Sequence, residues 1–152
     1  MPPIDPLTLL RGAEAARTRP EQSAAAIAQA LAAAPGVLEV HLAAYRFHFY
    51  NHDYSAAATQ ARALLSLVAR RLNIAQDWAE VAPDDADFTA HEAAPGLYLQ
   101  ALVGLGYCAA RLGEAALAHA VLTKAAALDP TDRFGGAWLL ARIEAGEAEA
   151  EL

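Results

Sequence analysis

Three histidines, His41, His48 and His52, have the spacing in this chain that comes nearest to a metal site. They recur at intervals of seven and four residues, so a helix would carry them on one stripe. His48 and His52 stand at the i, i+4 spacing at which two imidazoles can bind one ion. Packing explains His41 and His48, His52 is expected in the turn, and two ligands do not complete a site. We therefore predict no bound metal and keep His48 and His52 as weak candidates.

The other motifs that could carry chemistry lack essential members. The acidic residues between positions 84 and 87 resemble part of a calcium loop, but the alternating spacing, the central glycine and the distal glutamate are missing. His91-Glu92 is followed by Pro95 where a zinc-protease motif needs its second histidine, and no Gly-x-Ser-x-Gly segment occurs. These gaps predict that the protein is not an enzyme and uses no cofactor.

Composition and charge narrow the class of protein further. The chain has 152 residues, of which 56% are hydrophobic but only 7% aromatic, and alanine is the commonest hydrophobic residue. Alanine favours helices and lets them approach closely, so we expect one all-α domain. The formal net charge is −7, and the only basic cluster is that of Arg62, Arg70 and Arg71. Nucleic acid is therefore not expected as a partner.

The N-terminal residues, the lengths of the apolar stretches and the single cysteine all indicate the cellular compartment. The N-terminal residues lack the basic and then apolar order of a secretory signal, and we expect charge to interrupt every later apolar stretch before about 18 residues. Cys108 is the only cysteine, so no internal disulfide can form. We predict a cytoplasmic protein that does not associate with membranes.

The clearest internal pattern lies in the C-terminal half. It reads Leu102-x2-Leu105-Gly106, Gly113, Ala118-x3-Leu122-x2-Ala125 and Pro130. This string resembles the tetratricopeptide repeat (TPR). In that repeat small residues keep two antiparallel helices close, a glycine permits the turn between them, and a proline ends the second helix. Ala109 departs from the family pattern, which usually has a tyrosine there.

Two weaker units precede this one. The second has a turn at His52-Asp53-Tyr54, and its first helix is expected over Leu38 to Asn51. Its second helix carries the slots Ala57, Ala61 and Leu64. A shift of 34 residues from His52 reaches Thr18, where Thr18-x2-Glu21 reads as a capping box with Pro20 in the first helical turn. The slots of this first unit are filled by Leu7, Leu10, Ser23, Ile27 and Ala30.

The resemblance implies a short α-solenoid of antiparallel helix pairs, wound as a right-handed superhelix and closed by a C-terminal capping helix. We place repeats at about 4–37, 38–71 and 99–132, an insertion at 72–98 and the capping helix at 133–148, all in one domain spanning 1–152. Asp132 is expected to cap the last helix. Phe134 and Trp138 in that helix either cover the core, which we favour, or pair across a homodimer. Glu147, Glu149 and Glu151 oppose the helix dipole, so the end should fray.

In such arrays the first helix of each unit lines a concave surface that binds partners. Helical spacing places nine residues on it: Glu39, Leu42, Arg46, Phe49, Tyr50, Gln100, Val103, Tyr107 and Arg111. Aromatic rings and arginines are the usual anchors of protein interfaces. The resemblance to small bacterial TPR proteins thus implies a protein-binding adaptor, assembly factor or chaperone that holds a peptide or helix of another protein. The alternative is that the aromatic rings of these residues only fill the inside of the superhelix and bind no partner.

The insertion raises two further expectations. It is acidic but contains Trp78, Val81 and Phe88, and disordered segments seldom carry such residues, so we expect the rings to anchor it against the helices. Because it enters between the second and third units, Trp78 and Phe88 could also form a lid over the groove. The alternative function is a metal-binding accessory protein or an enzyme that uses the His41, His48 and His52 stripe or this acidic insertion.

Overall fold

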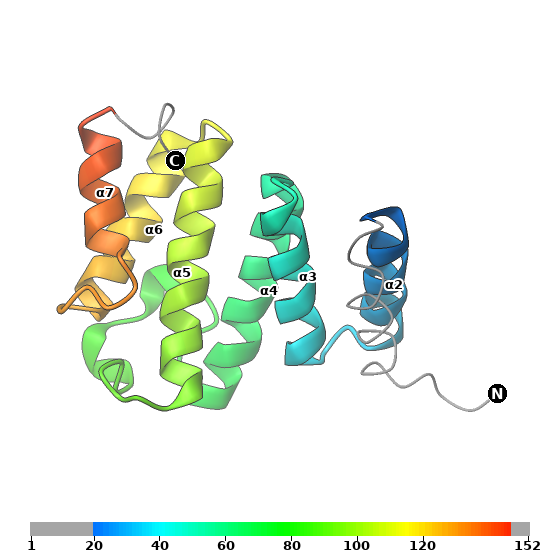
Figure 1. The fold of residues 1–152 in the computed structure, drawn as a ribbon. Coiled ribbons are helices and arrows are strands. Elements are labelled where there is room, and N and C mark those ends of the chain that lie inside the picture. The colour runs from blue at the N-terminus through cyan, green and yellow to red at the C-terminus, as the bar shows by residue number, and fades with distance from the viewer. Residues whose placement is uncertain (1–19, 147–152) are drawn as a thin grey trace.

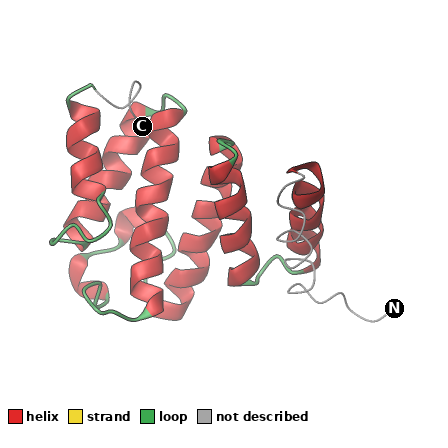
Figure 2. Cartoon of the chain, viewed as in Figure 1, coloured by secondary structure: helices red, strands yellow, loops and turns green. Residues whose placement is uncertain are grey.

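The computed structural model describes residues 20–146 and shows an all-α protein with no strand in that range (Figures 1 and 2). Its helices are α2 (Pro20–Ala33), α3 (Leu38–Tyr50), α4 (Tyr54–Leu72), α5 (Ala93–Arg111), α6 (Ala115–Leu128) and α7 (Gly136–Glu144). Two short 3-10 turns, η1 (Trp78–Glu80) and η2 (Pro83–Asp85), lie between α4 and α5. Each helix from α2 to α7 packs on the next in the chain, so the helices form a row (Figure 1).

The turns inside the two helix pairs have the same unusual backbone conformation. His52, between α3 and α4, has a φ of 59°, and Gly113, between α5 and α6, has a φ of 78°. Left-handed backbone of this kind reverses the chain tightly at the end of a helix. Asp53 then caps α4, because its side chain accepts a hydrogen bond from the Ala56 N–H at 3.2 Å. Both turns therefore lie where the repeat pattern predicted them.

The second helix of each predicted unit buries the same three slots. These are Ser23, Ile27 and Ala30 in α2; Ala57, Ala61 and Leu64 in α4; and Ala118, Leu122 and Ala125 in α6. Small residues let the helices approach closely. A Cβ atom at Gly106 of α5 would lie 2.5 Å from two side-chain atoms of Leu122, so only glycine fits this contact. The slots predicted for the second helices are thus confirmed as core positions.

The ends of the third helix pair agree in part with expectation. Helix α6 stops at Leu128, two residues before Pro130. Asp132 caps α7 as predicted, since its two carboxylate oxygens accept hydrogen bonds from the Ala137 and Trp138 N–H groups at 2.9 and 3.1 Å. Helix α5 begins at Ala93, so six residues that we assigned to the insertion are helical.

Several predicted residues lie outside the described range, namely Leu7, Leu10, Thr18, Glu147, Glu149 and Glu151.

One sequence expectation about α5 was wrong. Positions 93–110 carry no charged residue, so charge does not interrupt every apolar stretch within 18 residues. By length and composition alone α5 could cross a membrane. It packs against α4, α6 and α7, and 61% of its apolar window is buried. A core helix has the same properties, and the compartment of the protein stays a prediction.

Candidate functional site

A groove of about 210 Å³ opens between α3, α5 and α7. It brings together four of the predicted residues, Phe49, Gln100, Val103 and Tyr107. The remaining lining residues are Tyr45, Gly104, Phe134 and Leu139, which the sequence analysis did not assign to it. The lining is mostly aromatic and aliphatic, so the groove is suited to apolar side chains.

Tyr45 is the groove residue most closely tied to the helix opposite. Its ring lies over Gly104 of α5, where an added Cβ atom would come within 2.0 Å of the Tyr45 hydroxyl oxygen. Burial of the ring raises the pKa of Tyr45 far above its ordinary value. A small residue at 104 is therefore what lets this tyrosine enter the groove. The glycine on the groove face of α5 was the feature of the sequence from which this position of Tyr45 could have been predicted.

A cluster of rings that includes the groove residues Phe49 and Tyr107 lies near the C-terminal end of α5. The Tyr107 ring lies 5.2 Å from Phe49 and 5.7 Å from Tyr54, measured between centroids. The guanidinium carbon of Arg111 stands 5.3 Å from the centroid of the Tyr54 ring, within the range of a cation–π contact. Burial and then a hydrogen bond with Tyr54 raise the pKa of Tyr107. Arg111 thus contacts the ring of Tyr54 but is not among the residues that line the groove.

The other predicted groove residues are not part of the lining. Leu42 packs against the main core, whereas Glu39 and Arg46 are exposed on α3. Tyr50 is 83% exposed at the end of that helix. These four predicted residues are therefore not brought together in the groove.

Helix α7 contributes to the groove and also exposes a ring. Phe134 packs against the core, and Leu139 is 5% exposed. Trp138 is 57% exposed, and the Arg142 guanidinium lies 4.8 Å from its ring centroid. Phe134 covers the core as predicted, but it precedes the last helix, which begins at Gly136 and not at 133. The prediction that Trp138 covers the core was wrong, because its side chain is mostly exposed.

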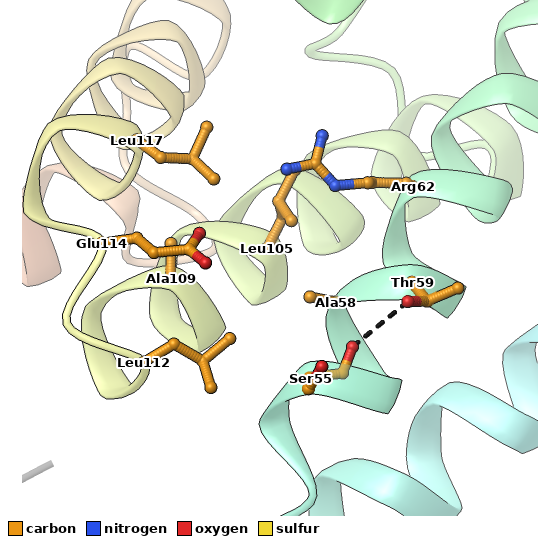
Figure 3. A pocket seen from close by; sticks show the side chains of 9 residues that line it. All are labelled: Ser55, Ala58, Thr59, Arg62, Leu105, Ala109, Leu112, Glu114 and Leu117. Carbon is orange, nitrogen blue, oxygen red and sulfur yellow. Dashed lines mark hydrogen bonds between the residues drawn. The ribbon is translucent and has the colours of Figure 1, made fainter.

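A second pocket, of about 180 Å³, lies between α4, α5 and the start of α6 (Figure 3). Leu105 and Ala109 of α5 are two of its apolar lining residues, while Arg62 and Glu114 extend toward it from two sides. At 100° per residue, Leu105 and Ala109 lie on roughly the opposite side of α5 from Val103 and Tyr107. The two pockets are therefore on different faces of the protein.

The histidine stripe has partners within the protein. His41 contacts the Gln60 side-chain oxygen at 2.7 Å through Nδ1, and the Pro35 carbonyl through Nε2. The His52 ring stacks on Tyr54, with centroids 5.8 Å apart. No group of three or more histidine, cysteine, aspartate or glutamate side chains within residues 20–146 could hold a metal ion.

The segment between α4 and α5 packs on the helices as predicted. Val81 and Phe88 are buried, and Trp78 packs partly against the same core. The Lys124 ammonium of α6 donates a 2.6 Å hydrogen bond to the Val81 carbonyl. The rings thus anchor this segment to the core. None of its residues lines the groove, so their positions give no support to the lid that we proposed for Trp78 and Phe88.

Comparison with known proteins gives one informative match. Azotobacter chroococcum mcd 1 has a protein described as an uncharacterized 19.8 kDa protein in the nifW 5′ region. The two sequences are 37% identical over 126 residues, which are 80% of this chain and 69% of that protein. This chain belongs to the same family. No family model matches the sequence, and no solved structure matches it either.

Proposed function

We propose that this protein is a TPR-like adaptor that binds a segment of another protein in the groove between α3, α5 and α7. The observation that carries the proposal is the groove itself, which is open to solvent although aromatic and aliphatic side chains line it. Apolar surface that stays accessible commonly marks a protein-binding site. The groove is also built on helices, which hold its lining in fixed positions.

The TPR-like arrangement is supported by two repeated features and by one close helix contact. The turns at His52 and Gly113 share a left-handed backbone, the second helices bury the same three slots, and Gly106 packs directly on Leu122. In a stack of such pairs, the first helices form one continuous surface. Helices α3 and α5 are those first helices, and both line the groove.

The proposal is tested by filling the groove. Gln100 is exposed on the groove side of α5, so Gln100→Trp adds a large ring there without opening the core. Gln29→Trp is the matched control, because Gln29 is an exposed residue of α2 that does not line the groove. Both variants should keep the helical circular dichroism and melting temperature of the wild type.

Tagged full-length protein would be purified from the organism that encodes it, and co-purified proteins identified by mass spectrometry. We expect partners that bind the wild type and Gln29→Trp but are lost with Gln100→Trp. The Arg46→Ala/Arg111→Ala variant should lose them in part. The relative is described by its place in the nifW 5′ region, so the nifW product is the first protein to look for. A partner set that Gln100→Trp leaves unchanged would remove the groove from the proposal.

A further inference from the structure

The pocket between α4, α5 and the start of α6 has one basic and one acidic residue on two different walls. Arg62 extends toward it from α4, and Glu114 from the start of α6 (Figure 3). His119 and Glu144 form the only ion pair within residues 20–146. Arg62 and Glu114 are thus paired neither with each other nor with another charge in that range. Both are exposed, so each is available to a charge on another molecule.

The hydrogen bonds around the pocket do not involve these two charged groups. Glu114 is the N-cap residue of α6, yet its side chain makes no capping hydrogen bond. The Thr59 hydroxyl donates a 3.2 Å hydrogen bond to the Ser55 carbonyl, one turn earlier in α4 (Figure 3). The Arg62 guanidinium makes no hydrogen bond in the described part of the chain. Arg62 and Glu114 are therefore the charged groups that a ligand of this pocket would meet.

Between the two charges the surface of the pocket is apolar and open. Leu105 and Ala109 are buried lining residues, whereas Leu112, at the end of α5, is 42% exposed. The polar side chains of the lining are all exposed. Small-molecule sites bury most of their ligand, and exposed side chains cannot enclose one in that way. The pocket is thus better suited to the surface of a protein than to a small molecule.

The surface of α6 beside the pocket is uncharged. Ala116, Ala120, Thr123 and Ala127 are exposed and, at 100° per residue, lie within about 60° of one another around the helix. Ala120 is also about 60° from the pocket residue Leu117. Standard protein interfaces bury about 800 Å² of each partner. A protein bound at the pocket can reach such an area by also covering this stripe of small side chains.

We propose that this face binds a second copy of the chain, related by a twofold axis that passes between Arg62 and Glu114. In a twofold dimer the same patch meets itself, so a residue on one wall faces the residue on the other wall of the second copy. Arg62 of each copy then pairs with Glu114 of the other, and α6 of each lies on α4 of the other. Leu112 is on α5, between those helices, and lies near the axis. The groove is on a different face and stays open in both copies, so this dimer goes beyond the proposed function.

Analytical ultracentrifugation of the full-length protein tests the dimer directly. Its mass should rise from 16.0 kDa toward twice that value as the concentration increases from about 1 µM to about 1 mM, the range expected for a small reversible interface. Arg62→Glu places a carboxylate opposite Glu114 at two symmetric contacts, so the dimer Kd should rise by about tenfold or more. Glu114→Arg should have the same effect. Arg71→Glu is the matched control, because Arg71 is exposed on roughly the opposite side of α4.

Recovery of the dimer is the result that is specific to the proposed pairs. Arg62→Glu/Glu114→Arg exchanges the two charges. An equal mixture of the two single variants forms a mixed dimer in which both contacts again join opposite charges. The double variant and the mixture should therefore dimerise about as tightly as the wild type, and added salt should weaken all three dimers. Every variant should keep the helical circular dichroism of the wild type, and Gln100→Trp should dimerise as the wild type does.

Several outcomes would overturn the proposed dimer. A wild type that stays monomeric at about 1 mM would do so, and a different protein that then co-purifies only while Arg62 and Glu114 are intact would be the occupant instead. A dimer that none of the charge variants weakens would have another interface, on α7 if Trp138→Ala dissociates it and in the groove if Gln100→Trp does. Single variants that dissociate, with no recovery in the mixture, would show that Arg62 and Glu114 do not pair across the axis.

Discussion

Replacement of Gly106 by alanine tests the packing of α5 on α6, on which the groove depends. A Cβ atom at position 106 would lie 2.5 Å from both Cγ and Cδ2 of Leu122 and 3.3 Å from Cδ1. Carbon atoms in proteins prefer separations of about 3.5–4.0 Å. Leu122 is fully buried, so it cannot turn out into solvent to relieve the contact. The helices or the leucine must therefore shift.

Two opposing terms set the size of the effect. Forced repacking in a filled core costs about 1–3 kcal/mol, and two contacts as short as these place Gly106→Ala in the upper half of that range. Alanine in place of glycine inside a helix recovers about 1 kcal/mol. The free energy of unfolding should thus fall by about 1–2 kcal/mol. For a chain of this size the melting temperature should drop by roughly 2–8 °C.

Urea and thermal denaturation of the full chain would measure this loss. Gly36→Ala is the control, since an added Cβ there meets no atom within 4 Å, and its unfolding free energy should change by less than about 0.5 kcal/mol. Leu122→Ala makes room for the new methyl group, so Gly106→Ala should cost at least about 1 kcal/mol less in that background. If Gly106→Ala is as stable as the wild type, or costs the same in both backgrounds, the packing argument fails.

Four further changes should have measurable effects. Gly104→Ala should displace Tyr45, whose hydroxyl would meet the new Cβ at 2.0 Å. Since only the far end of a half-buried ring must move, stability should change by less than about 1 kcal/mol, while partners that co-purify with the wild type should bind this variant more weakly. Burial raises the pKa of Cys108 to about 12, so a thiol reagent at neutral pH should label it only as fast as the protein unfolds, and rapid labelling of the native state would contradict this. Because that pKa is higher in the folded chain than the ordinary value of 9.0, the folded state holds the proton more tightly, so stability should be full below pH 9.0 and decline as the pH rises toward 12, less steeply in Cys108→Ala. Lys124→Met removes the donor to the Val81 carbonyl, so amide hydrogen exchange around Val81 should accelerate while α4 and α5 stay protected, and uniform exchange across the chain would refute a local role.

The helical framework could be predicted because its signals are local and repeated. A turn glycine, three small or aliphatic slots and a closing proline each act within one helix pair, so their spacing alone places them. Even the first unit, whose pattern is weak, buries Ser23 and Ile27 as expected. The segment around Phe88 was predicted to pack for a similar reason, since a large ring is costly to leave in water.

The groove was predicted only in part, because its lining depends on how helices cross. Helical spacing selected Phe49, Val103 and Tyr107 correctly. It could not show that Tyr45 reaches over Gly104, or that α7 returns to place Leu139 beside α5, since both depend on contacts between elements far apart in sequence. The early start of α5 was missed for a different reason. The repeat pattern placed the start of the third unit at 99, but the helix begins at Ala93 and has Pro95 in its first turn, where proline is tolerated.

The character of α5 explains why the protein has a groove at all. A helix with no charge over positions 93–110 must be covered on most of its circumference, and α4, α6 and α7 provide that cover. Helices α3 and α7 stand on either side of one remaining stripe, and Gln100, Val103 and Tyr107 line the groove along it. A fourth helix laid along this stripe would complete the burial of α5. In our proposal a partner segment takes that place.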